Sequence, residues 1–128
     1  MENIWIEHFG EEKFISMIYN NVPPLENLRI EKIEITREGD RISVAFDLPI
    51  YADKPPRKWI ERGYTTTYVE IDFFYIKEVS LKSNNNKYRG NIDIKKDVDI
   101  GDLIVHIGGT VEANIKAGAG LIQSVSGY

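Results

Sequence analysis

The feature that most restricts the fold of this chain is an alternation of apolar and polar residues that recurs from about position 28 to the C-terminus. One clear stretch runs from Arg41 to Leu48, where every second residue is a large apolar one. A period of two is typical of a strand with one face in the core and one face in water. The stretches follow one another without the intervening helices of a parallel α/β sheet. We therefore expect a mainly β protein of the α+β class, an antiparallel β-sandwich or open barrel with one N-terminal helix.

Breaks in the alternation divide it into about seven or eight expected strands. The phase shifts at Glu31-Lys32, which indicates a β-bulge or a strand break. Turns are expected at Glu38-Gly39-Asp40 and from Ser83 to Asn86, because Gly and Asn tolerate turn dihedrals. Gly118-Ala119-Gly120 is expected to separate a last strand, 121–128, from the strand before it.

The first 20 residues contain the only segment that predicts a helix. Glu11 and Glu12 would lie in its first turn, where the helix dipole favours carboxylates. An apolar stripe at helical spacing follows, formed by Phe14, Ile15, Met17 and Ile18. Pro23-Pro24 prevents the helix from continuing.

Length and composition favour one globular domain, 1–128. A chain of 128 residues with 42% hydrophobic residues is long enough to bury one core. The formal net charge of −4 argues against a protein that coats nucleic acid and is compatible with a basic protein partner. There is no cysteine, which excludes disulfides and thiolate chemistry.

The N-terminus lacks a signal-peptide core, and no apolar run approaches the ~18 residues of a membrane span. We therefore expect a cytoplasmic protein that does not bind a membrane.

No motif in the sequence predicts catalysis. His8 and His106 are far apart, and the aspartates between Asp93 and Asp102 do not match a calcium loop. The serines lie in no nucleophile elbow, and Gly118-x-Gly120 lacks the Lys-Ser or Lys-Thr of a phosphate loop. We therefore expect no enzyme, no metal and no cofactor.

The segment 49–63 is the strongest candidate for recognition, because long irregular segments in small domains are often functional. A prolyl pair presets its backbone before Arg57, Lys58 and Trp59, and Tyr64 follows. Arg, Trp and Tyr are the usual hot-spot residues of protein interfaces, and the same cluster is the best nucleic-acid candidate in the chain. In the alternative interpretation Trp59 is buried and anchors the segment to the core.

Glu70 and Asp72 form the second candidate surface, because residues two apart on a strand share a face. Three interpretations stay open: a carboxylate pair in a cleft, a solvated sheet face, and an acidic patch that meets a basic partner.

The order of landmarks along nearly the whole chain resembles the immunity protein 50 family of bacterial polymorphic-toxin systems. These landmarks are Trp5 before Phe9-Gly10, Pro24-Leu25-Glu26-Asn27, Asp47-Leu48-Pro49, Pro55-Pro56-Arg57-Lys58-Trp59, Gly63-Tyr64, a strand ending near Phe73, and Ser126-Gly127-Tyr128. The Pro-Pro-x-Lys-Trp segment is the most specific of them.

The resemblance implies a cytoplasmic immunity protein that binds a cognate toxin and neutralises it by occluding it. The partner-binding residues expected on this basis are Arg57, Lys58, Trp59, Tyr64, Glu70 and Asp72. The alternative is a small-ligand binding module or an unrecognised hydrolase with its site under segment 49–63. Such a site would be lined by Tyr51, Trp59, Tyr64, Phe74 and Tyr75. The oligomeric state and the identity of the toxin are left open.

Overall fold

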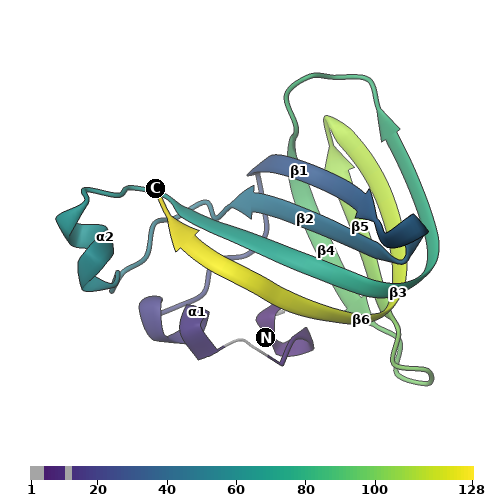
Figure 1. The fold of residues 1–128 in the computed structure, drawn as a ribbon, viewed down its shortest axis with the longest axis horizontal. Helices are drawn as coiled ribbons and strands as arrows, with labels where there is room; N and C mark the ends of the chain where they lie inside the picture. Colours follow the sequence, from purple (N-terminus) through teal and green to yellow (C-terminus); the bar gives the residue numbers. More distant parts are fainter. Residues whose placement is uncertain (1–4, 11–12) are drawn as a thin grey trace.

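Six antiparallel strands form one sheet that closes on itself in the order β1-β2-β3-β6-β5-β4 (Figure 1). The computed structural model describes residues 5–10 and 13–128. The strands are β1 Leu28–Thr36, β2 Arg41–Asp47, β3 Thr67–Ser83, β4 Arg89–Lys96, β5 Leu103–Gly109 and β6 Val111–Gly127. The helices are the 3-10 turns η1 Trp5–His8 and η2 Arg37–Gly39 and the short α-helices α1 Lys13–Ile18 and α2 Arg57–Glu61. The mainly β class and the antiparallel architecture are confirmed.

The number of strands is lower than expected because β6 is continuous through Gly118-Ala119-Gly120. Gly118 and Gly120 form no turn, and at Gly120 a glycine is needed for close packing. A Cβ at Gly120 would lie 2.6 Å from the ring of Phe9 and 2.8 Å from Leu103, so only glycine lets the N-terminal segment approach the strand. The separate last strand, 121–128, was therefore a wrong prediction.

The expected N-terminal helix is present as α1, which covers the predicted apolar stripe but is shorter than the segment 1–20. In the described part of this segment there are two pieces, η1 and α1, on either side of Gly10, a poor helix former. The predicted first turn at Glu11 and Glu12 lies outside the described residues. Only half of the apolar stripe is buried, since Phe14 and Met17 are exposed. Segment 49–63, expected to be irregular, contains α2.

The alternation in β2 predicts that Ser43 and Ala45 lie on a solvent-exposed face. Both residues are instead buried. Ala45 lies in register between Lys32 on β1 and Glu70 on β3, and the ammonium and carboxylate of this pair approach to 3.5 Å across it. Ser43 donates a hydrogen bond to the adjacent Asp72 carboxylate at 2.7 Å. Long charged side chains on the neighbouring strands therefore cover this central strand.

Two local predictions are confirmed. The register of β1 with β2 shifts between Ile30 and Lys32, which is the predicted irregularity at Glu31-Lys32. The predicted turn at Glu38-Gly39-Asp40 is η2, where the Asp40 amide donates to the Arg37 carbonyl.

Strand pairing is very uneven around the ring. Strands β3 and β6 pair along almost their whole length, from Thr67 to Ser83, whereas β1 and β4 pair only at Leu28 with Gly90 and at Arg29 with Arg89. We call this two-pair junction the β1–β4 seam. Strand β2 leaves β3 at Phe74, and Tyr75 follows with a φ of 55°. Beyond this point β3 diverges from β2 (Figure 1).

Candidate functional site

A polar row crosses four strands at the seam end of the barrel. Arg89 on β4, Arg29 on β1, Asp47 on β2 and Tyr68 on β3 are successive register partners. Directly opposed residues of antiparallel strands point to the same face. This is the outer face, because the neighbours of Asp47 in the chain are buried in the core. The seam therefore presents two arginines side by side.

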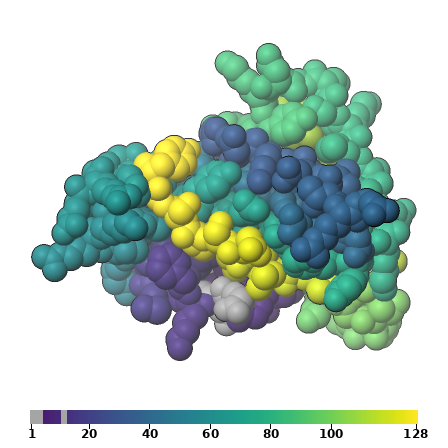
Figure 2. Space-filling model, in the orientation of Figure 1, coloured from purple at the N-terminus to yellow at the C-terminus, as the bar shows by residue number. Residues whose placement is uncertain are grey.

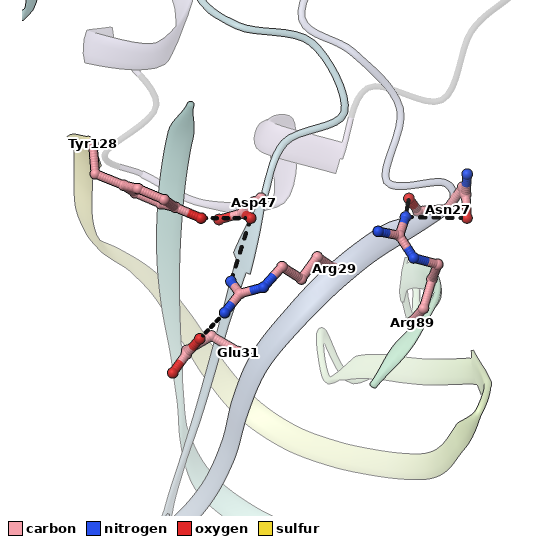
Figure 3. Close-up of polar contacts among 6 residues, drawn as sticks. All are labelled: Asn27, Arg29, Glu31, Asp47, Arg89 and Tyr128. Carbon is pink, nitrogen blue, oxygen red and sulfur yellow. Dashed lines mark hydrogen bonds and ion pairs between the residues drawn. The ribbon is translucent and has the colours of Figure 1, made fainter. Parts of the chain in front are cut away.

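Arg29 is held by carboxylates (Figure 3). Its Nη1 lies 3.3 Å from Asp47 Oδ2, and its Nη2 pairs with Glu31. The Tyr128 hydroxyl donates to the same Asp47 oxygen at 2.8 Å. Hydrogen bonding to Glu31 raises the pKa of Arg29, and hydrogen bonding to the Asp47 carboxylate raises the pKa of Tyr128. Arg29 is thus fixed in place with its charge balanced.

Arg89 is bound differently, although it lies next to Arg29. Its Nη1 donates to the backbone carbonyl of Asn27 at 2.9 Å and to the side-chain oxygen of Asn27 at 3.4 Å (Figure 3). Asn27 is itself held in place. Its backbone N–H donates a hydrogen bond to Asn91 Oδ1, and its φ is 53°. Within the described residues Arg89 has no acidic partner within 4.0 Å, and neither has Lys87 beside it. The seam therefore carries positive charge that the described part of the chain does not balance.

Two cavities flank this row, and Arg29 and Arg89 line both of them. The larger, about 710 Å³, lies between residues 29–31 of β1 and the segment 85–89. The smaller, about 330 Å³, lies between the row and segment 48–51. Asp47 and Tyr51 line the smaller cavity, and Asp47 Oδ1 and the Tyr51 hydroxyl are buried and have no hydrogen-bond partner among the described residues.

The family model for immunity protein 50 matches residues 11–128. The chain belongs to the immunity protein 50 family. No curated protein and no solved structure matches it. The resemblance that the sequence landmarks gave is therefore confirmed over nearly the whole chain of this immunity protein 50 member.

The residues predicted in and just after segment 49–63 fall into an exposed group and a buried group. Arg57 and Lys58 are exposed on α2, and Arg57 pairs with Glu61 at 3.3 Å. Trp59 is only 7% exposed, and Tyr64 is half-buried against the core. The Trp59 ring packs edge-on against Phe14, with the ring centroids 6.2 Å apart. In this structure Trp59 has the burial that the anchor alternative predicted.

Glu70 and Asp72 share the outer face of β3, as the strand period predicted, but cations cover both carboxylates. Lys32 lies over Glu70 at 3.5 Å, and Arg41 lies 3.9 Å from Asp72, whose side chain is 3% exposed. In each pair the cation is the more exposed partner. Lys32 and Arg41 thus shield the carboxylates of Glu70 and Asp72 from solvent, while Glu34 beside Lys32 is 52% exposed.

Sequence reasoning missed the seam residues Arg29, Asp47, Arg89 and Tyr128. They come from four strand ends and share no local spacing, so only the closure of the ring brings them together. The one sequence signal was Asp47 and Tyr128, which stand within two of the family landmarks.

Two further observations concern metal binding and membrane spans. Among residues 5–10 and 13–128, no group of three His, Cys, Asp or Glu side chains is arranged to hold a metal ion. None of the described helices has the length and apolar character to cross a bilayer.

Proposed function

We propose that this chain is a cytoplasmic immunity protein that binds a cognate bacterial toxin and neutralises it by occluding the toxin's surface. The observation that carries this proposal is the family match over residues 11–128. The proposal requires no catalytic step, and we expect the protein to act by binding alone.

The geometry of the outer surface supports a binding role. Arg and Tyr side chains are enriched at the energetic centres of protein interfaces. At the seam end, Arg29 and Tyr128 are already held by Asp47, so they would lose little conformational freedom when a partner binds. A patch of ~800 Å² on this chain would be ordinary for a stable complex.

Two faces of the protein are candidates for the contact. The first is α2, which projects at one end of the molecule (Figure 2) and on which Arg57 and Lys58 are exposed; Tyr64 follows it in the chain. Trp59 would serve this face by holding α2 in position. The second is the outer face of the barrel, where a partner would meet the cations above Glu70 and Asp72.

Co-expression tests the function directly. The upstream neighbouring reading frame is expressed in a bacterial host with and without this chain, and survival is measured. We expect the neighbour to be toxic alone and harmless in the presence of this chain, and the two products to elute as one complex. A harmless neighbour, or killing that this chain does not relieve, would contradict the proposal.

One observation keeps the small-ligand alternative open. The cavity of about 330 Å³ beside segment 48–51 is lined by Asp47 and Tyr51, each of which has one buried polar atom without a partner among the described residues. Of the aromatic residues expected to line such a site, only Tyr51 does so. A thermal-shift screen against metabolites tests this alternative, and a stabilising ligand whose effect is lost in Asp47→Asn would favour it.

A further inference from the structure

Two strand edges are left without a neighbouring strand on the two sides of one opening. Strand β1 pairs with β4 only at Leu28 and Arg29 but continues to Thr36. Strand β3 continues to Ser83 after β2 has left it at Phe74. In Figure 1 these two edges and the segment 84–88 frame the opening, and in Figure 2 the region around 84–90 projects above β1. Unpaired strand edges carry backbone donors and acceptors that another strand can bind.

The inner face of the barrel is uncovered near these edges. Ile35, Val79 and Leu81 are 45%, 38% and 44% exposed. Their register partners Ile42, Ile115 and Ala113 are all core residues. Opposed residues share a face, so the three exposed aliphatic side chains belong to the inner face. Apolar surface of this kind is typical of an interaction site.

The charge at the opening indicates which charge a partner would carry there. The cavity of about 710 Å³ between β1 and segment 85–89 is lined by Arg29, Lys87 and Arg89 against one carboxylate, Glu31. Glu31 is already paired with Arg29. Lys87 and Arg89 therefore give a local positive charge in a chain whose net charge is −4, and carboxylates of a partner would complement it.

We propose that an extended, acidic segment of the cognate toxin lies in this opening and adds as a strand to the free edge of β1, with its apolar side chains on Ile35, Val79 and Leu81. This inference rests on the proposed immunity function, and it assigns the contact to the opening and not to α2 or to the cations above Glu70 and Asp72. The occupant is a different chain, because two copies of this protein paired through the same edge would bring Lys87 and Arg89 of both into one interface.

Hydrogen exchange on the complex tests strand addition. The full chain is measured alone and bound to a catalytically inactivated product of the upstream neighbouring reading frame. We expect the amides of residues 31–36 to exchange at least about 10-fold more slowly in the complex. Unchanged exchange in 31–36, with protection confined to α2, would overturn the inference.

A charge-matched pair of variants tests the surface independently. Lys87→Glu changes the opening, and its side chain makes no hydrogen bond within the described part of the chain. Lys95→Glu makes the same charge change on β4, where the Lys95 side chain is 72% exposed. We expect the Kd for the toxin to rise about 10-fold or more in Lys87→Glu and less than about 3-fold in Lys95→Glu. Thermal melts of both variants establish that each is folded.

The outcomes separate this inference from the function on which it rests. A wild-type chain that neither binds nor rescues would overturn both. A wild-type chain that binds, with no larger loss of affinity in Lys87→Glu than in Lys95→Glu, would leave immunity standing and overturn the opening as the site. A dimer in solution with residues 31–36 protected before the toxin is added would assign the edge to a second copy and also overturn it.

Discussion

The contact around Trp59 and the β1–β4 seam both join distant parts of the chain, but they are built from different kinds of residue. At the Trp59 contact, the indole packs against the rings of Phe14 and Tyr51, and a Cβ at Gly127 would lie 2.8 Å from it. At the seam, two residue pairs join β1 to β4, and exposed charged side chains lie beside them. The first contact excludes water, whereas the second leaves strand edges and charges accessible.

Under the proposed function, this difference would separate stability from recognition. Burying a large aromatic side chain contributes several kcal/mol, whereas an exposed ion pair contributes about 0–1 kcal/mol. The family landmark Pro55-Pro56-Arg57-Lys58-Trp59 therefore includes a residue of the stabilising contact, whereas the polar groups of the seam stay accessible to the partner that we propose. Three experiments test this division.

The largest expected effect is on the Trp59 contact. Trp59→Ala removes the indole from a closely packed site, so we expect the free energy of unfolding to fall by about 3–5 kcal/mol. Urea denaturation measures the change. Ile60→Ala is the control, because Ile60 is the next residue of α2 and is 63% exposed, and it should cost less than about 0.5 kcal/mol. A folded Trp59→Ala protein of unchanged stability that fails to bind the toxin would reverse the division and make Trp59 an interface anchor.

The sequence predicted the antiparallel class because alternation is a local property, readable within each strand. It did not predict that Gly118 to Gly120 lie inside β6, since the side chains that require glycine at position 120 come from Phe9 and Leu103, more than ten residues away in the chain. The N-terminal helix is shorter than the segment 1–20 for a related reason. Trp5 and Phe9, which precede α1, pack into the barrel core through tertiary contacts that no local pattern indicates.

The candidate site was less predictable than the fold. The sequence correctly placed Glu70 and Asp72 on one face, but the covering cations Lys32 and Arg41 come from two other strands. Arg29 and Arg89 are isolated in the sequence and adjacent only after the ring closes. The burial of Trp59 was one of two alternatives, because an aromatic residue in a proline-rich segment is equally typical of an anchor and of a contact.

The second prediction concerns Tyr19, which holds α1 against the segment before α2. Its hydroxyl donates to the carbonyl of Ile50, and burial raises its pKa from 10.0 to about 12. The unfolded chain loses this proton near pH 10 and the folded chain near pH 12, so stability should fall by on the order of 2 kcal/mol as the pH rises through this window.

Tyr19→Phe is the matched comparison, because it removes the titrating group and keeps the ring. We expect Tyr19→Phe to be about 1 kcal/mol less stable than wild type at pH 7, where the hydrogen bond is lost. Above about pH 11 the order should reverse. Parallel stability curves for the two proteins between pH 9 and pH 12 would show that Tyr19 does not titrate differently in the fold.

The smallest expected effect is at the seam. Arg29→Met keeps an apolar stem but removes the ion pairs with Asp47 and Glu31. Because the Arg29 side chain is 48% exposed, solvent screens these pairs, and we expect a loss below about 1 kcal/mol that shrinks further at 1 M salt. Urea denaturation at low and high salt measures it, with Arg57→Met on α2 as the control for a fully exposed pair. A loss above about 2 kcal/mol that persists in salt would mean that Arg29 holds the ring shut. The seam would then stabilise the fold as the Trp59 contact does, and the two contacts would no longer differ in this respect.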